Sequence, residues 1–285
     1  MEHEVRSGGV RLAVREWPGA GPALLLMHGL ASSQHIWDLV APRFARAGFR
    51  VATYDQRGHG RSGKPSSGYG FDTVSTDAAA VIRELGLHRP VVVGHSWGAN
   101  VALELAVRQP RSVAGTVLVD GGFLNLGSRM DWPTTKRELA PPALRGTPVH
   151  EFLETLRYFL AGQVEITPEV EAVFLSLMRV DRHGNIHPRL SHANHLRILH
   201  ALWAQDTQGL LRRVRVPSLV LAVRSKLAGA DSAGFMHEKE RAAAGVRSIG
   251  TPVRFEWIDG IHDIPPQRPE ALARRISRFA RQPVG

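Results

Sequence analysis

The sequence predicts an α/β fold with a mainly parallel central sheet. Short apolar runs alternate with longer segments of helical periodicity along most of the 285 residues. Several runs, such as Ala23–His28 and Val91–Gly94, are apolar throughout, which is typical of central parallel strands covered on both faces. One long stretch, from about Phe123 to Asp206, contains helical patterns but no good strand. These observations favour a sheet flanked by helices and interrupted by a helical insertion.

Seven short runs bounded by turn residues are the candidate strands. In chain order they are Arg11–Glu16, Ala23–His28, Arg50–Tyr54, Val91–Gly94, Gly115–Asp120, Ser218–Val223 and Val253–Ile258. Between them, four segments have helical patterns, near Ile36–Ala47, Val74–Leu85, Trp97–Gln109 and Pro269–Arg281. Strands that alternate with helices in this way predict a parallel sheet with helical crossovers.

The stretch at about residues 123–206 is expected to form a lid rather than a separate domain. Its helical patterns are punctuated by prolines and lie near Thr147–Leu160, Pro168–Met178 and Ser191–Ala204. We therefore expect one domain over residues 1–285, with a core of residues 1–122 and 207–285 and a helical lid inserted between them.

Composition narrows the classes of protein that fit. The chain carries 36 lysines and arginines against 26 aspartates and glutamates, a net charge of +10. A basic balance can indicate nucleic-acid binding, but the arginines are scattered, so we expect a solvated surface and no nucleic-acid partner. The absence of cysteine excludes disulfides, thiolate metal sites and a cysteine nucleophile.

No targeting or membrane segment is expected. The segment Met1–Val10 is polar and lacks the apolar region of a signal peptide. No apolar run approaches the roughly 20 residues that a membrane span needs. These features predict a cytoplasmic protein without membrane association, and they leave its oligomeric state open.

The sharpest chemical signal is the pentapeptide GHSWG at residues 94–98. It follows a candidate strand and opens a candidate helix, which is the context of a G-x-S-x-G nucleophile elbow. Glycine is needed at both ends because side chains at positions 94 and 98 would collide with neighbouring backbone. The N–H groups at the start of the helix can receive a developing oxyanion. We predict Ser96 as a nucleophile, with a plain tight turn as the alternative.

With this motif, the sequence resembles the α/β-hydrolase superfamily over nearly the whole chain. The segment MHGL at residues 27–30 is similar to the family's H-G-x oxyanion turn. This resemblance implies that the backbone N–H groups of Leu30 and Trp97 bind the oxyanion and that His28 is structural. Residues 54–62, YDQRGHGRS, resemble the family's D-x-R-G-x-G-x-S segment. That segment is a scaffold turn, so no catalytic role is expected for Asp55, Arg57 and His59.

A serine hydroxyl needs a base at neutral pH, and the chain offers 14 histidines. His262 follows the last candidate strand and precedes the C-terminal helix. Members of the superfamily keep the catalytic histidine on this loop, and the chain order Ser…His agrees. The resemblance therefore implies that His262 is the general base. The alternative is an ordinary residue of a surface loop.

Two aspartates compete for the third position. In most of the family the acid follows the strand predicted at Ser218–Val223, but this chain has Lys226 near the expected place and Asp231 five residues further on. The other family position is the end of the strand after the nucleophile helix, where Asp120 lies. We favour Asp120, keep Asp231 as the alternative acid, and note that Asp120 could instead cap a turn.

Histidines crowd the insertion at His183, His187, His192, His195 and His200, but neither a metal nor a cofactor is expected. His192 and His195 could share a helix face, yet no carboxylate pairing supports a metal site there. One of these histidines could face the cleft. Six large apolar residues recur in the insertion at helical spacing, which is more typical of core than of ligand contacts: Trp132, Phe152, Phe159, Phe174, Met178 and Trp203. If the insertion is a lid, we expect some of them to line an apolar pocket.

These features predict a serine hydrolase that cleaves a carboxylic ester or lactone of a small, partly apolar substrate through an acyl-enzyme. Amide cleavage, as in iminopeptidase-like relatives, is an alternative. So is a cofactor-free dioxygenase, which uses a His/Asp dyad on the same fold, and so is a non-enzymatic ligand receptor. Epoxide hydrolases and haloalkane dehalogenases need an aspartate where this chain has Ser96.

Overall fold

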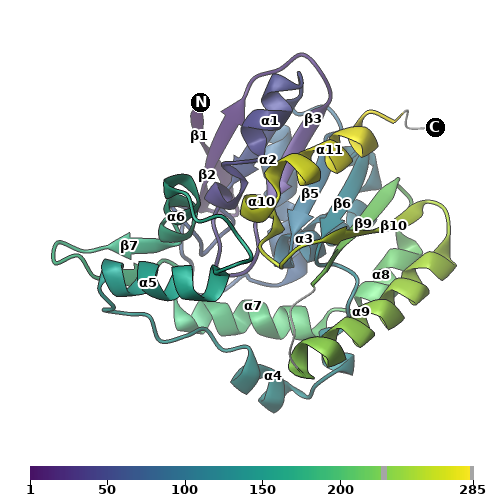
Figure 1. Ribbon diagram of the computed structural model, residues 1–285. Coiled ribbons are helices and arrows are strands. Elements are labelled where there is room, and N and C mark those ends of the chain that lie inside the picture. The colour runs from purple at the N-terminus through teal and green to yellow at the C-terminus, as the bar shows by residue number, and fades with distance from the viewer. Residues whose placement is uncertain (226–229, 283–285) are drawn as a thin grey trace.

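The computed structural model describes residues 1–225 and 230–282, and the side chains of residues 230–233 lie outside that description. Its centre is an eight-stranded sheet with the order β1-β2-β4-β3-β5-β6-β9-β10 (Figure 1). Strands β1 and β2 pair antiparallel, as do β2 and β4, and all other neighbours are parallel. The prediction of a mainly parallel sheet is confirmed. The strands are β1 (Glu2–Ser7), β2 (Val10–Trp17), β3 (Ala23–Met27), β4 (Arg50–Tyr54), β5 (Val91–His95), β6 (Gly115–Val119), β9 (Ser218–Arg224) and β10 (Val253–Asp259).

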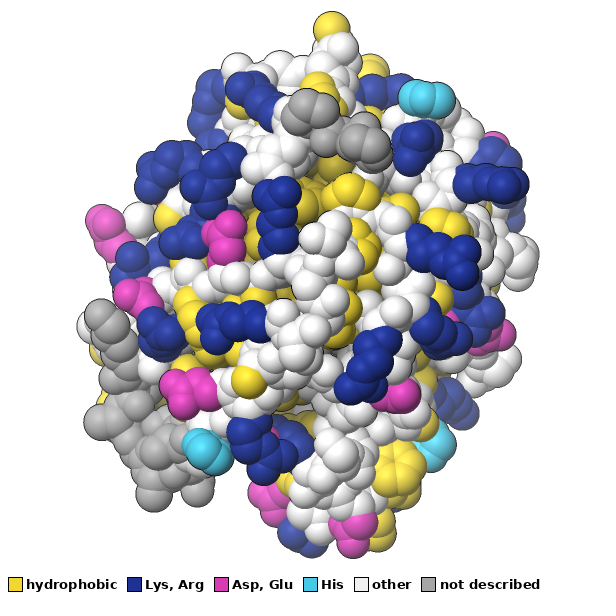
Figure 2. All heavy atoms as spheres, turned by 90° about the vertical axis from the view of Figure 1, so that its right-hand side faces the viewer, with side chains coloured by type: hydrophobic (Ala, Val, Ile, Leu, Met, Phe, Trp, Pro, Cys, Tyr) yellow, Lys and Arg dark blue, Asp and Glu magenta, His cyan; other side chains and the backbone are white. Residues whose placement is uncertain are grey.

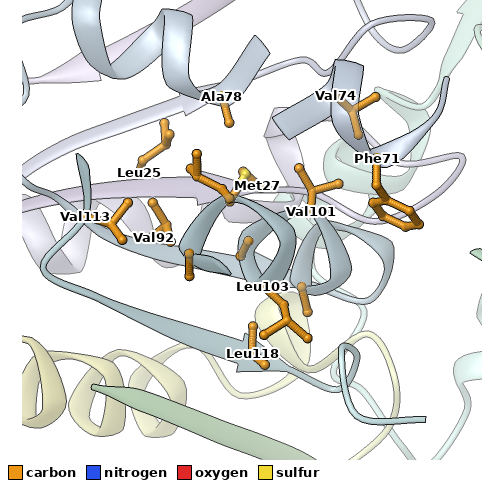
Figure 3. Close-up of a cluster of buried hydrophobic side chains, with 14 of the residues drawn as sticks. Leu25, Met27, Phe71, Val74, Ala78, Val92, Val101, Leu103, Val113 and Leu118 are labelled. Carbon is orange, nitrogen blue, oxygen red and sulfur yellow. The ribbon is translucent and has the colours of Figure 1, made fainter. Parts of the chain in front are cut away.

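Helices cover both faces of the sheet, and the alternation of side chains along each strand divides the core into two clusters. On β3, Leu25 and Met27 pack into one cluster, whereas Leu24 and Leu26 pack into the other. Figure 3 shows Leu25 and Met27 among the side chains of the first cluster. Helices with side chains in this cluster include α2 (Phe71–Glu84), α3 (Trp97–Arg108), α8 (Thr207–Arg213) and α9 (Ala230–Ile249). Those of the opposite face are α1 (Ala41–Arg46), α10 (Ile264–Gln267) and α11 (Pro269–Ala280).

The segment between β6 and α8 is mostly helical and runs along the left side and the bottom of Figure 1. It contains α4 (Trp132–Glu138), α5 (Val149–Leu160), α6 (Pro168–Leu175) and α7 (His192–Ala204). The expectation that it has no strand is wrong, because β7 (Met178–Val180) and β8 (Ile186–Pro188) form a short hairpin. Asp181 closes the turn of the hairpin by accepting the N–H groups of His183 and Asn185 at 2.8 and 3.0 Å. Strands of three residues are too short to show a period, so turn chemistry was their main signal.

Three other elements differ from the expectation. The helix expected near Ile36–Ala47 is split into a 3₁₀ turn at Gln34–Trp37 and α1. Pro42 is the reason, because proline is tolerated in the first turn of a helix but not in its interior. The edge strand β1 and the 20-residue helix α9 were not expected. Strand β1 buries only Val5 and Ser7, so it lacks an apolar face. The sequence of α9 is rich in alanine and charged residues and has no wide apolar stripe.

On the face of the molecule drawn in Figure 2, the charged side chains are scattered, as the sequence predicted. On the face drawn in Figure 2, basic side chains are interspersed with carboxylates and uncharged groups. Among the described residues, none of the helices combines the length and apolarity required to cross a bilayer.

Candidate active site

Ser96 lies in a strained turn between β5 and α3. Its backbone has φ 54° and ψ −124°, outside the regions that side chains normally allow. The turn is held by the Ser96 N–H, which donates to the Val119 carbonyl at 2.9 Å. A Cβ at Gly94 would lie 2.1 Å from the Gly98 carbonyl oxygen, and one at Gly98 would lie 2.5 Å from the His28 oxygen. Both glycines are therefore required by close backbone approach, as the sequence predicted.

His262 reaches the serine from the loop after β10. Its Nε2 lies 3.0 Å from Ser96 Oγ. The backbone of the loop is held by His95, whose Nε2 donates to the His262 carbonyl oxygen at 2.8 Å. The His262 side chain is 55% exposed, so the pair is open to a substrate from solvent.

Asp120 completes the chain of contacts. It follows β6 with φ 45°, and its Oδ2 lies 2.7 Å from His262 Nδ1. The carboxylate is buried, with only 1% of the side chain exposed. Its Oδ1 accepts the Val223 N–H at 2.9 Å and the Lys239 ammonium at 2.7 Å. The structure thus brings residues 96, 262 and 120 together. The alternative acid, Asp231, has a side chain outside the described residues.

The electrostatics of the pair follow from these contacts. Burial by itself raises the pKa of Asp120, but the hydrogen bond and charge of His262 and the Lys239 ammonium outweigh it and hold the pKa well below its usual range. Desolvation lowers the pKa of His262, but the Asp120 hydrogen bond and carboxylate charge outweigh that effect and raise the pKa above its ordinary value of 6.5. Asp120 is therefore ionised and orients an imidazole that accepts a proton more readily than a free one.

The two predicted oxyanion donors lie in turns close to Ser96, since a Cβ at Gly29 would lie 3.0 Å from Ser96 Cβ. Leu30 belongs to the turn after β3, and Trp97 is the first residue of α3. Within the described part of the chain, neither of their backbone N–H groups donates to a protein acceptor. The turn after β3 is braced by His59, whose Nε2 accepts the N–H of Ala31 at 3.2 Å and whose ring stacks on Trp97 at 5.3 Å between centroids. Both N–H groups are thus free of protein acceptors among the described residues, and His59 contacts both turns.

His28, in the turn after β3, and the segment at residues 54–62 make contacts within the scaffold. His28 is fully buried, and its Nε2 accepts the N–H of Gln56 at 3.0 Å. Burial lowers the pKa of His28 to about 4, so its ring is neutral. Asp55 accepts the N–H groups of Gln34 and Arg61 at 2.9 and 2.8 Å. The guanidinium of Arg57 pairs with the carboxylate of Asp77, and both side chains are buried.

The histidines of the insertion are dispersed. His195 lies 3.3 Å from the Leu139 carbonyl, and His187 pairs with Asp181 at 2.8 Å, away from His195. Among the side chains that the structure describes, no three histidines or carboxylates lie close enough together to hold a metal ion. Trp132 contacts both His200 and Trp203, so these aromatic residues pack on one another.

Three residues around the site were not assigned by sequence reasoning. His95 has no signal in the sequence beyond its place in the elbow motif. Gly121 faces the elbow so closely that a Cβ there would lie 2.1 Å from the Ser96 carbonyl oxygen. Lys239 had no local signal, because α9 lacks a pattern that would mark one lysine as buried. Only the Gly121-Gly122 pair after a strand end offered a clue to a tight backbone approach.

Comparison with known proteins gives a consistent result. A family model described as alpha/beta hydrolase fold matches residues 22–221. A putative non-heme haloperoxidase of Mycobacterium phage D29 is 36% identical over 122 residues, which is 42% of this chain and 44% of that protein. A 2-(acetamidomethylene)succinate hydrolase of Mesorhizobium japonicum is 35% identical over 120 residues, 42% of each chain. The chain thus spans less than half of the length of these curated relatives.

Among solved structures, the fold is matched over nearly the whole chain. The crystal structure of E-2-(acetamidomethylene)succinate hydrolase has a TM-score of 0.75 with 23% sequence identity and covers 98% of both chains. At this identity the likeness concerns the fold alone.

Proposed function

The chain belongs to the α/β-hydrolase fold family, and from this premise we propose that it is a serine hydrolase acting on a carboxylic ester or lactone. The substrate is small and partly apolar, and the reaction proceeds through an acyl-enzyme. The observation that carries the proposal is the continuous contact from Ser96 Oγ to His262 and on to Asp120, at 3.0 and 2.7 Å. A hydroxyl, an imidazole and a buried carboxylate in this order form the arrangement that activates a serine.

Acylation follows from the proton positions. The Asp120 carboxylate can only accept, so the Nδ1 of His262 carries a hydrogen and its Nε2 is free to accept one. Ser96 Oγ attacks the carbonyl carbon while Nε2 takes the hydroxyl proton. The imidazolium that forms is stabilised by Asp120 and then protonates the leaving alkoxide, which departs as an alcohol.

The negative charge of the tetrahedral intermediate develops beside the two free N–H groups of Leu30 and Trp97. Donors fixed in advance stabilise this charge without reorganisation, and each one contributes about 10²–10³ in rate. In the second half of the reaction His262 removes a proton from water. The resulting hydroxide attacks the acyl carbon, and the imidazolium returns its proton to Ser96 Oγ as the ester bond breaks and the acid leaves.

We place the pocket under the helical insertion. In this proposal residues 1–122 and 207–285 form the core and residues 123–206 the lid of a single domain. The two crossings between them are tied together, since Asn125 Nδ2 donates to Asp206 at 3.0 Å and Gln208 Nε2 donates to the Phe123 carbonyl at 2.6 Å. Such ties favour a lid of fixed position whose apolar residues shape the pocket.

Ser96 also separates this proposal from its rivals within the fold. Epoxide hydrolases and haloalkane dehalogenases need a carboxylate nucleophile, and position 96 carries a hydroxyl. A cofactor-free dioxygenase would use His262 and Asp120 without acylation of Ser96. Covalent labelling therefore distinguishes the two reactions.

The test is a fluorophosphonate probe followed by assays with p-nitrophenyl esters and a panel of lactones and amides. We expect the probe to attach to Ser96 and hydrolysis to fall by more than 10⁴ in Ser96→Ala, because the nucleophile is lost. Ser112→Ala, at a half-buried serine away from the elbow, is the matched control and should keep full activity. Unchanged hydrolysis in Ser96→Ala would overturn the proposal. Oxygen consumption with an aromatic substrate would instead favour a dioxygenase.

A further inference from the structure

A buried lysine lies behind the carboxylate that orients His262. Lys239 is on α9, with 6% of its side chain exposed. Its Nζ lies 2.7 Å from Asp120 Oδ1 and 3.1 Å from the Val223 carbonyl oxygen. Burial of an ammonium group costs free energy unless the group is paired and hydrogen-bonded. Here the Asp120 carboxylate and the Val223 carbonyl supply those interactions.

The ammonium sits where two neighbouring strands end. Asp120 follows β6, and Val223 lies near the end of β9, which pairs with β6. Val223 contributes both of its backbone groups: the N–H donates to Asp120 Oδ1, and the carbonyl accepts from Lys239. Oδ1 thus receives two donors, which leaves Oδ2 for His262 at 2.7 Å. Rotation of the carboxylate would break all three contacts at once.

We propose that Lys239 is a positioning residue of this hydrolase: its ammonium group keeps the Asp120 carboxylate ionised and in the one orientation that presents Oδ2 to His262. The inference rests on the proposed function, since it gives Asp120 the role of the orienting acid. Lys239 makes no contact with Ser96 in the structure and acts through Asp120.

The charge of the lysine has a second consequence for the base. Among the described residues, the groups that face His262 are Asp120, Asp263, Lys239 and the ring of His95, whose centroid is 5.0 Å away. The two carboxylates raise the pKa of His262, whereas the Lys239 charge lowers it. The ammonium therefore limits how strongly His262 holds a proton and keeps more of the neutral base available near neutral pH.

The lysine is itself held in place by neighbours on α9 and on the insertion. The ring of Phe235, one turn earlier on the helix, lies 5.1 Å from Nζ. Arg129, at the start of the insertion, stacks over the same ring at 4.8 Å and pairs with the carboxylate of Glu238. Glu238 thus forms its ion pair with Arg129, and Lys239 forms its ion pair with Asp120.

The test compares Lys239→Met, which removes the ammonium at nearly equal length, with Lys239→Gln, which retains a neutral donor. Lys136→Met, at an exposed lysine of α4, is the charge-matched control. Two readouts are needed. One is the pH profile of kcat/KM, and the other is the pKa of His262 by NMR titration in a Ser96→Ala background, where no turnover is required.

We expect both Lys239 variants to lose roughly tenfold or more in kcat at neutral pH, the size of a lost hydrogen bond to a charged group. The acid limb of kcat/KM and the NMR pKa of His262 should both move to higher pH, while Lys136→Met changes neither. An unmoved or lowered His262 pKa in folded Lys239→Gln, or a kcat within twofold of the parent, would overturn the inference. The NMR result stands without activity, so it separates this failure from a failure of the hydrolase proposal itself.

Discussion

Replacement of Asp120 by asparagine tests the arrangement of the site most directly. The substitution keeps the size and shape of the side chain and removes its charge. In the parent protein Oδ1 faces two donors, the Val223 N–H at 2.9 Å and Lys239 Nζ at 2.7 Å. Only the amide oxygen can occupy that place, because the NH₂ group would point its hydrogens at two other donors. The NH₂ group must then face His262 Nδ1.

The consequence is the wrong tautomer of the base. Nδ1 now has to accept a hydrogen bond, so the ring proton moves to Nε2, which faces Ser96 Oγ at 3.0 Å. An Nε2 that carries a proton cannot take the proton of the serine. A tautomer error of this kind costs about 10⁴ in kcat, which corresponds to about 5.4 kcal/mol of barrier at 1.36 kcal/mol per tenfold. The loss should fall on kcat rather than on KM, because substrate binding does not require the base.

The assay is steady-state hydrolysis of a p-nitrophenyl ester, with a thermal melt of each variant. The melt is needed because Asp120→Asn leaves the Lys239 ammonium without its counter-ion, and a broken buried pair costs about 3–5 kcal/mol of stability. Asp263→Asn removes one negative charge beside His262 without touching its hydrogen bonds, so its kcat should change by less than tenfold. A folded Asp120→Asn protein that keeps more than about a tenth of the parent kcat would refute the reasoning. Asp231→Asn would then be the next variant to make.

Three further outcomes are expected. Because the pKa of His262 is raised, the acid limb of kcat/KM should have its midpoint above pH 6.5, and a midpoint below that value would contradict the role of Asp120. Gly121→Ala should abolish activity or folding, since its Cβ would lie 2.1 Å from the Ser96 oxygen. Gly245→Ala, on α9, where the Cβ would lie in ordinary contact 3.4 Å from Gln208 Oε1, should be neutral or stabilising by up to about 1 kcal/mol. Burial lowers the pKa of His95 to about 4. Between pH 6.5 and pH 4, His95 is therefore protonated in the unfolded chain but neutral in the folded protein. In urea titrations at pH 7 and pH 5, His95→Gln should therefore lose about 2 kcal/mol less stability on acidification than the parent, and equal losses would speak against a neutral buried His95.

The parts of this protein that could be predicted from sequence are those set by local chemistry. The elbow is a five-residue turn, and its need for glycine at positions 94 and 98 comes from backbone that lies within a few residues or on the adjacent strand. Strands β3, β5 and β6 are buried on both faces, and they could be predicted because nearly all of their residues are apolar. Elements without such a signature escaped prediction, as the three-residue strands β7 and β8 and the edge strand β1 did.

The partners of His262 and Asp120 depended on tertiary structure, because hydrophobic periodicity does not encode the order of strands in a sheet. Asp120 lies 103 residues before Val223 and 119 before Lys239. The three meet only because β6 and β9 are neighbours and α9 packs beside their ends. The sequence by itself determined the turn that exposes Ser96 and the loop that carries His262. Which carboxylate reaches that imidazole, and which cation lies behind it, was decided by long-range packing, since a hydrogen bond requires positions accurate to a fraction of an ångström that no local pattern specifies.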